Sequence, residues 1–132
     1  MALQYSVAVN NARLDAVEST TGASALLKIF TSAVPANCAA ADGAGLICTI
    51  ALPADWMNAA AAGVKTLLGS WSGTASAGGT ALSFRIKNSG DTTCHIQGTV
   101  GQGAGDLSLN NTNLANGQTV SVTTFTLNSA NT

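Results

Sequence analysis

The stretch Ala81–Val100, ALSFRIKNSGDTTCHIQGTV, holds the clearest β-pattern of the chain. Apolar residues alternate with polar ones in both of its halves, which is typical of half-buried strands. Along the chain the residues of this apolar row are Leu82, Phe84, Ile86, Cys94, Ile96, Gly98 and Val100. Between the halves, Asn88-Ser89-Gly90-Asp91 has turn chemistry, because glycine tolerates positive φ and Asn and Asp bond their own backbone. The stretch therefore predicts a β-hairpin.

The register of this hairpin follows from sidedness, since a one-residue slip would move every apolar side chain to the wrong face. The predicted pairs are Leu82 with Gly98, Phe84 with Ile96, and Ile86 with Cys94. This register places His95 across from Arg85 on the polar face. Arg85, Lys87 and His95 then form either a solvated face or a contact patch for an acidic partner.

The composition is unusual in its lack of charge. Only 8% of the 132 residues are charged, against about a quarter in typical domains. A free monomer with so few charges has little colloidal protection, so much of the surface is expected to be covered by neighbours in an assembly. The net charge of −1 and the lack of a basic stripe argue against nucleic-acid binding. No secretory signal or membrane-spanning run is expected.

The rest of the chain predicts a mainly β, single domain of residues 1–132. A helix is expected over 3–18 and ended by Gly22, followed by an antiparallel β-sandwich over 25–127, with a jelly roll as one form of it. Strands are expected at 25–31, 46–52, 65–71, 106–110 and 119–127, the last with a bulge near Thr123-Thr124. Residues 54–63 predict a short helix or helical turn, and Gly-rich loops are expected at 73–79 and 101–105.

The inventory of reactive residues predicts no enzyme, metal site or cofactor. His95 is the sole histidine, and its neighbour Cys94 should point to the opposite face of the strand. The six acidic residues are scattered, without the spacing of a calcium loop. Three cysteines with no close pair favour free thiols in a reducing cytoplasm. One disulfide among Cys38, Cys48 and Cys94, leaving one thiol over, is the alternative.

Several segments resemble a family of small proteins of tailed phages and prophages. They are MALQYSVA at 1–8, NARLDA at 11–16, PANCAAAD at 35–42, LPADW at 52–56, FRI at 84–86 and TTCH at 92–95. The resemblance spans nearly the whole chain. Members are mostly uncharacterised and belong among virion structural genes. The chain departs from the family after Trp71, where it has Ser72-Gly73-Thr74 in place of a polar, partly acidic stretch.

The resemblance implies a virion structural protein, made in the host bacterial cytoplasm and assembled onto the particle. The first expectation is a decoration or cement protein that binds the major capsid protein in several copies. A small tail or head–tail connector component is the alternative. A receptor- or carbohydrate-binding module, with Trp56 or Trp71 as a stacking platform, is an alternative of another class. The candidate protein-contact residues are Leu3, Tyr5, Arg13, Trp56, Trp71, Arg85, Lys87 and His95.

Overall fold

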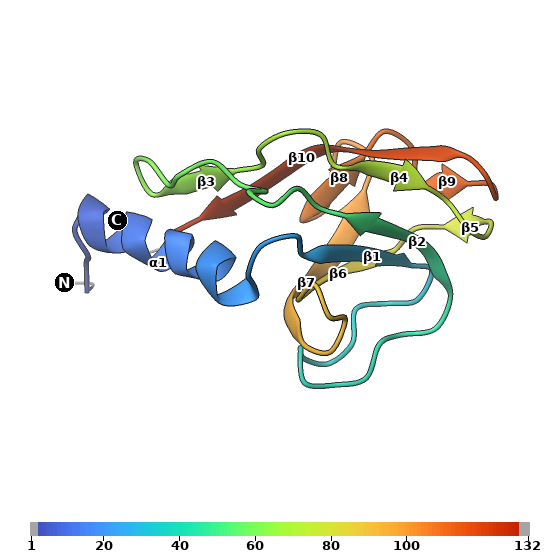
Figure 1. Ribbon diagram of the computed structural model, residues 1–132, viewed down its shortest axis with the longest axis horizontal. Coiled ribbons are helices and arrows are strands. Elements are labelled where there is room, and N and C mark those ends of the chain that lie inside the picture. Colours follow the sequence, from blue (N-terminus) through green and yellow to red (C-terminus); the bar gives the residue numbers. More distant parts are fainter. Residues whose placement is uncertain (1–2, 130–132) are drawn as a thin grey trace.

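A computed structural model describes residues 3–129 and confirms a mainly β fold with one helix at the N-terminal end (Figure 1). The elements are α1 (Val7–Thr21), β1 (Leu26–Phe30), β2 (Leu46–Ala51), β3 (Val64–Thr66), β4 (Ser72–Thr74), β5 (Gly79–Thr80), β6 (Ser83–Lys87), β7 (Cys94–Gly101), β8 (Leu107–Leu109), β9 (Asn113–Leu114) and β10 (Thr119–Asn128). The main sheet has the order β2-β1-β6-β7-β8-β10-β3, and β5 pairs with β9 apart from it.

The main sheet is strongly curled, which brings β4 near β2 (Figure 1). The long strand β10 pairs with β8 on one side and with both β3 and β4 on the other. β4 then lies against β2, where the Ser76 N–H donates to the Ile47 carbonyl at 2.8 Å. The apolar side chains enclosed by this curl form one core cluster.

A chain of aromatic rings runs through the core. Phe84 meets Phe125 edge to face with ring centroids 5.7 Å apart, and Phe125 lies 5.5 Å from Trp71. Trp71 in turn lies 5.8 Å from Trp56. Such tilted and edge-on contacts add to the free energy gained from apolar burial alone. The rings therefore connect β6 and β10 to the segment that follows β2.

The predicted hairpin forms as β6 and β7, but its register is shifted by two residues from the prediction. Ile86 lies opposite Ile96, Phe84 opposite Gly98, and Arg85 opposite Gln97, not His95. A bulge at the turn end places Lys87 opposite Cys94. From Ser83 to Ile86 the two-residue shift keeps the side chains on their predicted faces, so sidedness alone could not detect it. The bulge instead places Cys94, which was expected in the core row, beside Arg85 and Lys87. Gly98 explains the observed register. A Cβ at this position would lie 2.9 Å from the Phe84 ring, so the residue opposite Phe84 has to be glycine.

The burial of this hairpin also differs from the prediction. All five residues of β6 are buried, including Arg85 and Lys87, which were expected on a surface face. The outer face of the strand is covered by the segment between β1 and β2 and by the β6–β7 turn (Figure 1). Leu82, which was expected in the core row, lies before the strand and is exposed.

Helix α1 begins four residues later than predicted and ends three residues later. Ser6 is its N-cap and accepts a hydrogen bond from the Val9 N–H at 3.2 Å, which satisfies an otherwise unpaired donor of the first turn. The predicted C-cap, Gly22, is confirmed with φ of 93°. The buried residues of α1 are Asn10, Leu14 and Thr21, because the helix meets the domain mainly through polar side chains.

Residues 54–63 form no helix, despite the alanines. Ala62 and Gly63 both have positive φ and close a tight hairpin, in which Ala61 and Val64 exchange two backbone hydrogen bonds of 2.9 Å. Side chains of α1 accept hydrogen bonds from the N–H groups of this segment, so tertiary contacts override the helix propensity of alanine. The strand predicted over 65–71 is correspondingly short, and part of the loop predicted at 73–79 forms β4 and β5.

The C-terminal half agrees more closely with the prediction. The bulge expected near Thr123-Thr124 is confirmed, since the register of β10 with β8 shifts between Val122 and Thr124. Val120, Val122 and Phe125 are accordingly all buried. Residues 102–106 form the predicted glycine-rich turn. The strand that follows it, β8, pairs in parallel with β7. Gly103 and Gly105 have positive φ, which a connection this short requires.

Candidate functional site

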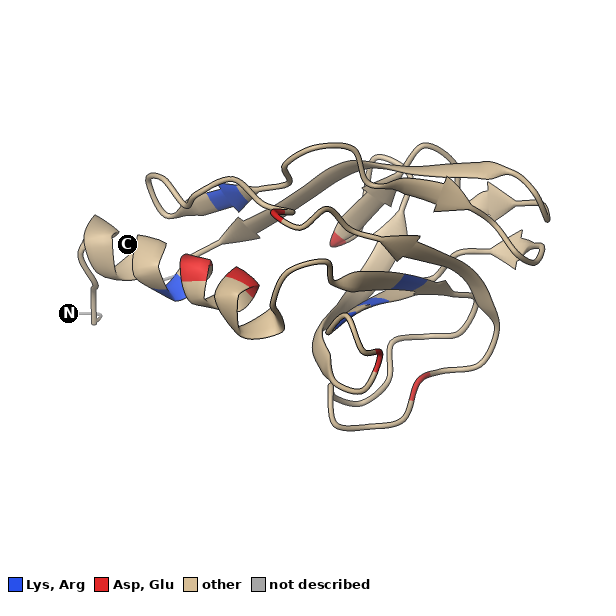
Figure 2. Ribbon diagram, viewed as in Figure 1, with Lys and Arg blue, Asp and Glu red and all other residues tan. Residues whose placement is uncertain are grey.

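Most of the charged side chains are used within the molecule (Figure 2). Four of the five basic and four of the six acidic residues take part in ion pairs. These residues form two groups. The loop cluster contains Lys28, Asp42, Arg85, Lys87 and Asp91. The helix cluster contains Asp15, Glu18 and Lys65.

Arg85 is the centre of the loop cluster. Its guanidinium is 2% exposed, and each of its five N–H groups has an acceptor. These acceptors are Asp42 Oδ1, the Ala40 and Asn37 carbonyls at 2.9 Å each, and Gln97 Oε1 at 2.9 and 3.2 Å. Gln97, directly across the hairpin from Arg85, donates to the Pro35 carbonyl at 2.8 Å. Arg85 therefore holds residues 35–42 against the outer face of the sheet.

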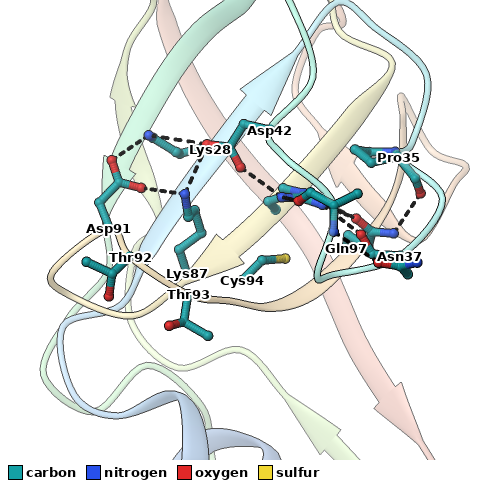
Figure 3. Close-up of polar contacts among 12 residues, drawn as sticks. Lys28, Pro35, Asn37, Asp42, Lys87, Asp91, Thr92, Thr93, Cys94 and Gln97 are labelled. Atoms are coloured by element: carbon teal, nitrogen blue, oxygen red, sulfur yellow. Dashed lines mark hydrogen bonds and ion pairs between the residues drawn. The ribbon is translucent and has the colours of Figure 1, made fainter.

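Two lysines complete the loop cluster (Figure 3). Lys87 Nζ lies 3.0 Å from a carboxylate oxygen of both Asp42 and Asp91. Lys28, which is paired with Arg85 across β1 and β6, donates to Asp91 at 2.6 Å. Two carboxylates from separate loops are thus shared among three cations on neighbouring strands. This arrangement fastens both loops to the strands.

The cations lower the pKa of both carboxyl groups of the loop cluster. Burial tends to raise the pKa of Asp42, but hydrogen bonds from Lys87 and Arg85 outweigh it. Hydrogen bonds from Lys28 and Lys87 lower the pKa of Asp91. Burial tends to lower the pKa of Lys87, yet its bonds to Asp91 and Asp42 raise it above its ordinary value. Asp42, Asp91 and Lys87 are therefore held in their charged forms.

These shifts predict a broad pH plateau of stability. The lowered carboxyl pKa values contribute stability that is complete above the ordinary value of 3.8 and is lost as pH falls through the folded-state values. The raised pKa of Lys87 contributes stability that is complete below 10.5 and is lost as pH rises through the folded-state value. Thermal unfolding at stepped pH measures this. A midpoint that falls between pH 7 and about pH 5 would contradict the carboxyl assignment.

The helix cluster joins α1 to the segment that replaces the predicted second helix. Lys65 is 2% exposed, and its ammonium bonds Asp15 at 2.8 Å, the Asn58 carbonyl at 2.9 Å and Glu18 at 3.0 Å. Glu18 also accepts from the N–H groups of Trp56 and Met57 at 3.1 and 2.9 Å. One carboxylate thus binds both the buried cation and two buried amides.

Replacing Glu18 with Ala is expected to lower the free energy of unfolding by about 2–3 kcal/mol, because buried donors lose their acceptor. Glu18→Gln keeps an oxygen for the two amides and should cost about 1 kcal/mol, reflecting the weakened bond to Lys65. Urea unfolding followed by circular dichroism gives both values. Equal losses for the two variants would mean that the charge, rather than the amide bonds, docks the helix.

The structure separates the predicted contact residues. Arg85 and Lys87 are buried in the loop cluster, whereas His95 lines a small pocket against α1, together with Arg13. The predicted patch of Arg85, Lys87 and His95 therefore does not form. The bulge opposite Lys87 explains this difference, because it changes the pairing of the strand next to His95.

The two tryptophans are core residues. Trp56 is 0% and Trp71 is 1% exposed, and their indole N–H groups donate to the carbonyls of Gly22 and Trp56 at 3.0 and 3.1 Å. Neither indole offers a face to a sugar. The interpretation of either as an exposed contact or stacking platform is wrong.

Most of the large apolar residues that are exposed lie near the start of the helix, whereas Leu46 and Leu82 lie elsewhere. Five of them form the apolar tip of the molecule: Leu3, Tyr5, Val7, Val9 and Val64. Val64 belongs to this group because Asn11 on α1 accepts from the Gly63 N–H at 2.9 Å. Arg13 stacks over the Tyr5 ring at 4.9 Å. Leu3 and Tyr5, predicted contact residues, thus remain available to a partner.

A cavity of about 620 Å³ lies beside the glycine turn after β7. Phe84, Ile96, Phe125 and Leu127 provide its apolar lining, and Asp106 is the only charged residue in it. The Asp106 carboxylate already accepts from the Thr99 N–H at 2.9 Å and its hydroxyl at 3.0 Å. Its lining contains no histidine, cysteine or lysine.

Within residues 3–129 no group of three or more His, Cys, Asp or Glu side chains is arranged to hold a metal ion. No helix among these residues is long and apolar enough to cross a membrane. Comparison with protein-family models, curated proteins and solved structures finds no match for this chain.

Proposed function

We propose that this chain is a virion structural protein, specifically a capsid decoration protein that binds the major capsid shell in several copies. The observation that carries the proposal is the internal pairing of its charges. The chain contains few charged residues, and eight of them are paired with one another in the two clusters. The rest of the exterior is therefore almost neutral. The proposal also draws on the resemblance to phage virion proteins.

One end of the molecule carries no charge at all. Residues 66–84 and 107–132 contain no Asp, Glu, Lys or Arg, and Figure 2 shows the end formed by β4, β5 and β9 without a coloured segment. The buried centres of protein interfaces are depleted in charged residues, since removing a charge from water is costly. A neutral surface of small polar residues is suited to close packing among subunits of a shell.

The apolar tip supplies a contact surface for the capsid. Val7 and Val9 are 55% and 43% exposed on a helix that extends beyond the sheet (Figure 1). Fully burying one such side chain contributes about 1.5–3 kcal/mol. Several subunits, each burying a tip at a junction between capsid proteins, would hold the shell against internal pressure. The mechanism is mechanical and needs no chemistry.

Binding to capsids that lack this protein tests the proposal. Purified protein should bind emptied, expanded capsids and raise their disruption temperature. Val7→Asp should weaken binding by more than about tenfold, because it places a charge within the apolar contact. The substitution suits the helix itself, since an acidic residue in the first turn is favourable.

Gln102→Glu is the matched control, since it adds the same charge at an exposed turn between β7 and β8, outside both the apolar tip and the charge-free segments. Its affinity should stay within about threefold of the original, well under the 1.4 kcal/mol of a tenfold change. Absence of capsid binding would reject the decoration role. Binding to the neck or tail of particles would support the connector alternative. Equal losses of capsid affinity in the two variants would show that the apolar tip is not the contact surface.

A further inference from the structure

Cys38 and Cys94 lie together although 56 residues separate them in the sequence. Both line a cavity of about 340 Å³ beside the loop cluster, with Asp42 and Arg85 among its other walls. The Cys94 thiol donates to the Ile96 carbonyl at 3.4 Å, and Cys38 is near enough to contribute to the raised pKa of Cys94. The third cysteine, Cys48, is absent from this cavity and donates to the Thr74 carbonyl at 3.6 Å.

The loop cluster fixes the position of both thiols. On the loop side, Arg85 bonds the carbonyls of Asn37 and Ala40, which stand on either side of Cys38. The Ala40 N–H donates to Asn37 Oδ1 at 3.0 Å and closes a tight turn around the cysteine. On the sheet side, the pairing of Cys94 with Lys87 positions its side chain (Figure 3). Ordering two thiols before they react reduces the entropy that closing a disulfide would otherwise cost.

The two thiols are chemically unequal. Burial, followed by the interaction with Cys38, raises the pKa of the Cys94 thiol to about 11. Cys94 is therefore a poor attacking group near neutral pH, because only the thiolate is nucleophilic. Cys38 is half-buried, whereas Cys94 is buried. Cys38 is thus the thiol that an external oxidant meets first.

We propose that Cys38 and Cys94 are a redox pair that forms an intramolecular disulfide under oxidising conditions and fastens residues 31–45 to β7. With glutathione disulfide as oxidant, the Cys38 thiolate attacks one sulfur and releases one glutathione thiolate. Cys94 then loses its proton and attacks the Cys38 sulfur of the mixed disulfide, releasing the second glutathione. The protein loses two protons and two electrons, and glutathione disulfide gains them.

The link would reinforce the loop cluster under conditions in which ion pairs weaken. Acid protonates Asp42 and Asp91, and high salt screens their attraction to the cations. A covalent link between the same loop and the same strand is affected by neither. The reduced form suits a reducing cytoplasm and the oxidised form suits the exterior of a cell. This inference does not depend on the capsid role.

The test is oxidation of the purified, reduced protein with glutathione disulfide, followed by intact mass and peptide mapping. The expected product is a monomer with one Cys38–Cys94 link and one free thiol at Cys48. Its unfolding midpoint should rise by about 5–15 °C and return on reduction with dithiothreitol. Cys48→Ala, the matched control, should form the same link. Cys38→Ser should instead stay without an intramolecular link.

Three results would overturn the inference: a link that includes Cys48, three free thiols after prolonged oxidation, or dimers linked between molecules. Because Cys94→Ser alters a buried position, Cys38→Ser is the deciding variant. Its circular dichroism spectrum in the reduced state should match that of the original protein. The rise in midpoint should be absent from this variant and present in Cys48→Ala.

Discussion

Arg85→Met is expected to lower the free energy of unfolding by about 3–5 kcal/mol, the usual cost of removing one partner of a buried ion pair. The guanidinium is 2% exposed, and methionine fills much of its space without any donor. The carbonyls of Asn37 and Ala40 and the amide oxygen of Gln97 lose their partner. Each of these lost hydrogen bonds adds to the loss. Residues 35–42 should detach from the sheet first.

Arg13→Met is the matched control, because Arg13 is the one basic residue that forms no ion pair with another of residues 3–129. Its guanidinium lies over the exposed Tyr5 ring, where such a contact is worth about 0.5–1 kcal/mol. Urea unfolding compares the two variants, and hydrogen exchange locates the loosened segment. Similar losses for Arg13→Met and Arg85→Met would contradict the role given to the loop cluster.

Trp56→Ala is expected to cost about 3–5 kcal/mol, the usual range for deleting a large buried aromatic side chain. The residue is 0% exposed, and its ring contacts Trp71. Its indole N–H also donates to the Gly22 carbonyl, the C-cap of α1. The variant should therefore disturb both the core and the end of the helix.

Trp56→Phe separates these two contributions, because it keeps an aromatic ring and removes the N–H donor. Its cost should be smaller than that of alanine and should include about 1–3 kcal/mol for the unsatisfied Gly22 carbonyl. Tyr5→Ala, at an exposed aromatic position, should change stability by less than about 1 kcal/mol. Thermal unfolding of the three variants checks the order. Equal losses for Trp56→Ala and Tyr5→Ala would place Trp56 outside the core.

Local pattern was sufficient for part of this fold. Strict alternation located the β6–β7 hairpin, and the change of phase between Val122 and Phe125 located the bulge of β10. Register was not accessible in the same way, because a shift of two residues leaves the alternation unchanged. Likewise, the alanines at 59–62 predicted a helix. Glu18 and Asp15 hold the segment that contains them in another conformation through hydrogen bonds that span 38 and 45 residues of sequence.

The candidate site was harder to predict than the fold. Alternation correctly put Arg85 and Lys87 on one face of a strand, but it cannot show that a loop covers that face. Asp42 lies 43 residues from Arg85, and nothing local connects them. One signal was present: a chain with so few charges still places Lys28, Arg85 and Lys87 within strands. Basic residues at such positions need acidic partners when they are buried, and Asp42 and Asp91 are the acidic residues of the adjoining loops.

The central claim is that the charged side chains pair within the molecule and that a nearly neutral surface binds the capsid. The salt dependence of capsid binding is its most direct test. Affinity for emptied capsids would be measured at about 0.05 and 0.5 M NaCl, between which screening of exposed charges increases strongly. The account predicts a change of less than about threefold, since apolar contacts of the tip carry the binding. A loss of more than about tenfold with salt would show that exposed charges carry it and would contradict the account.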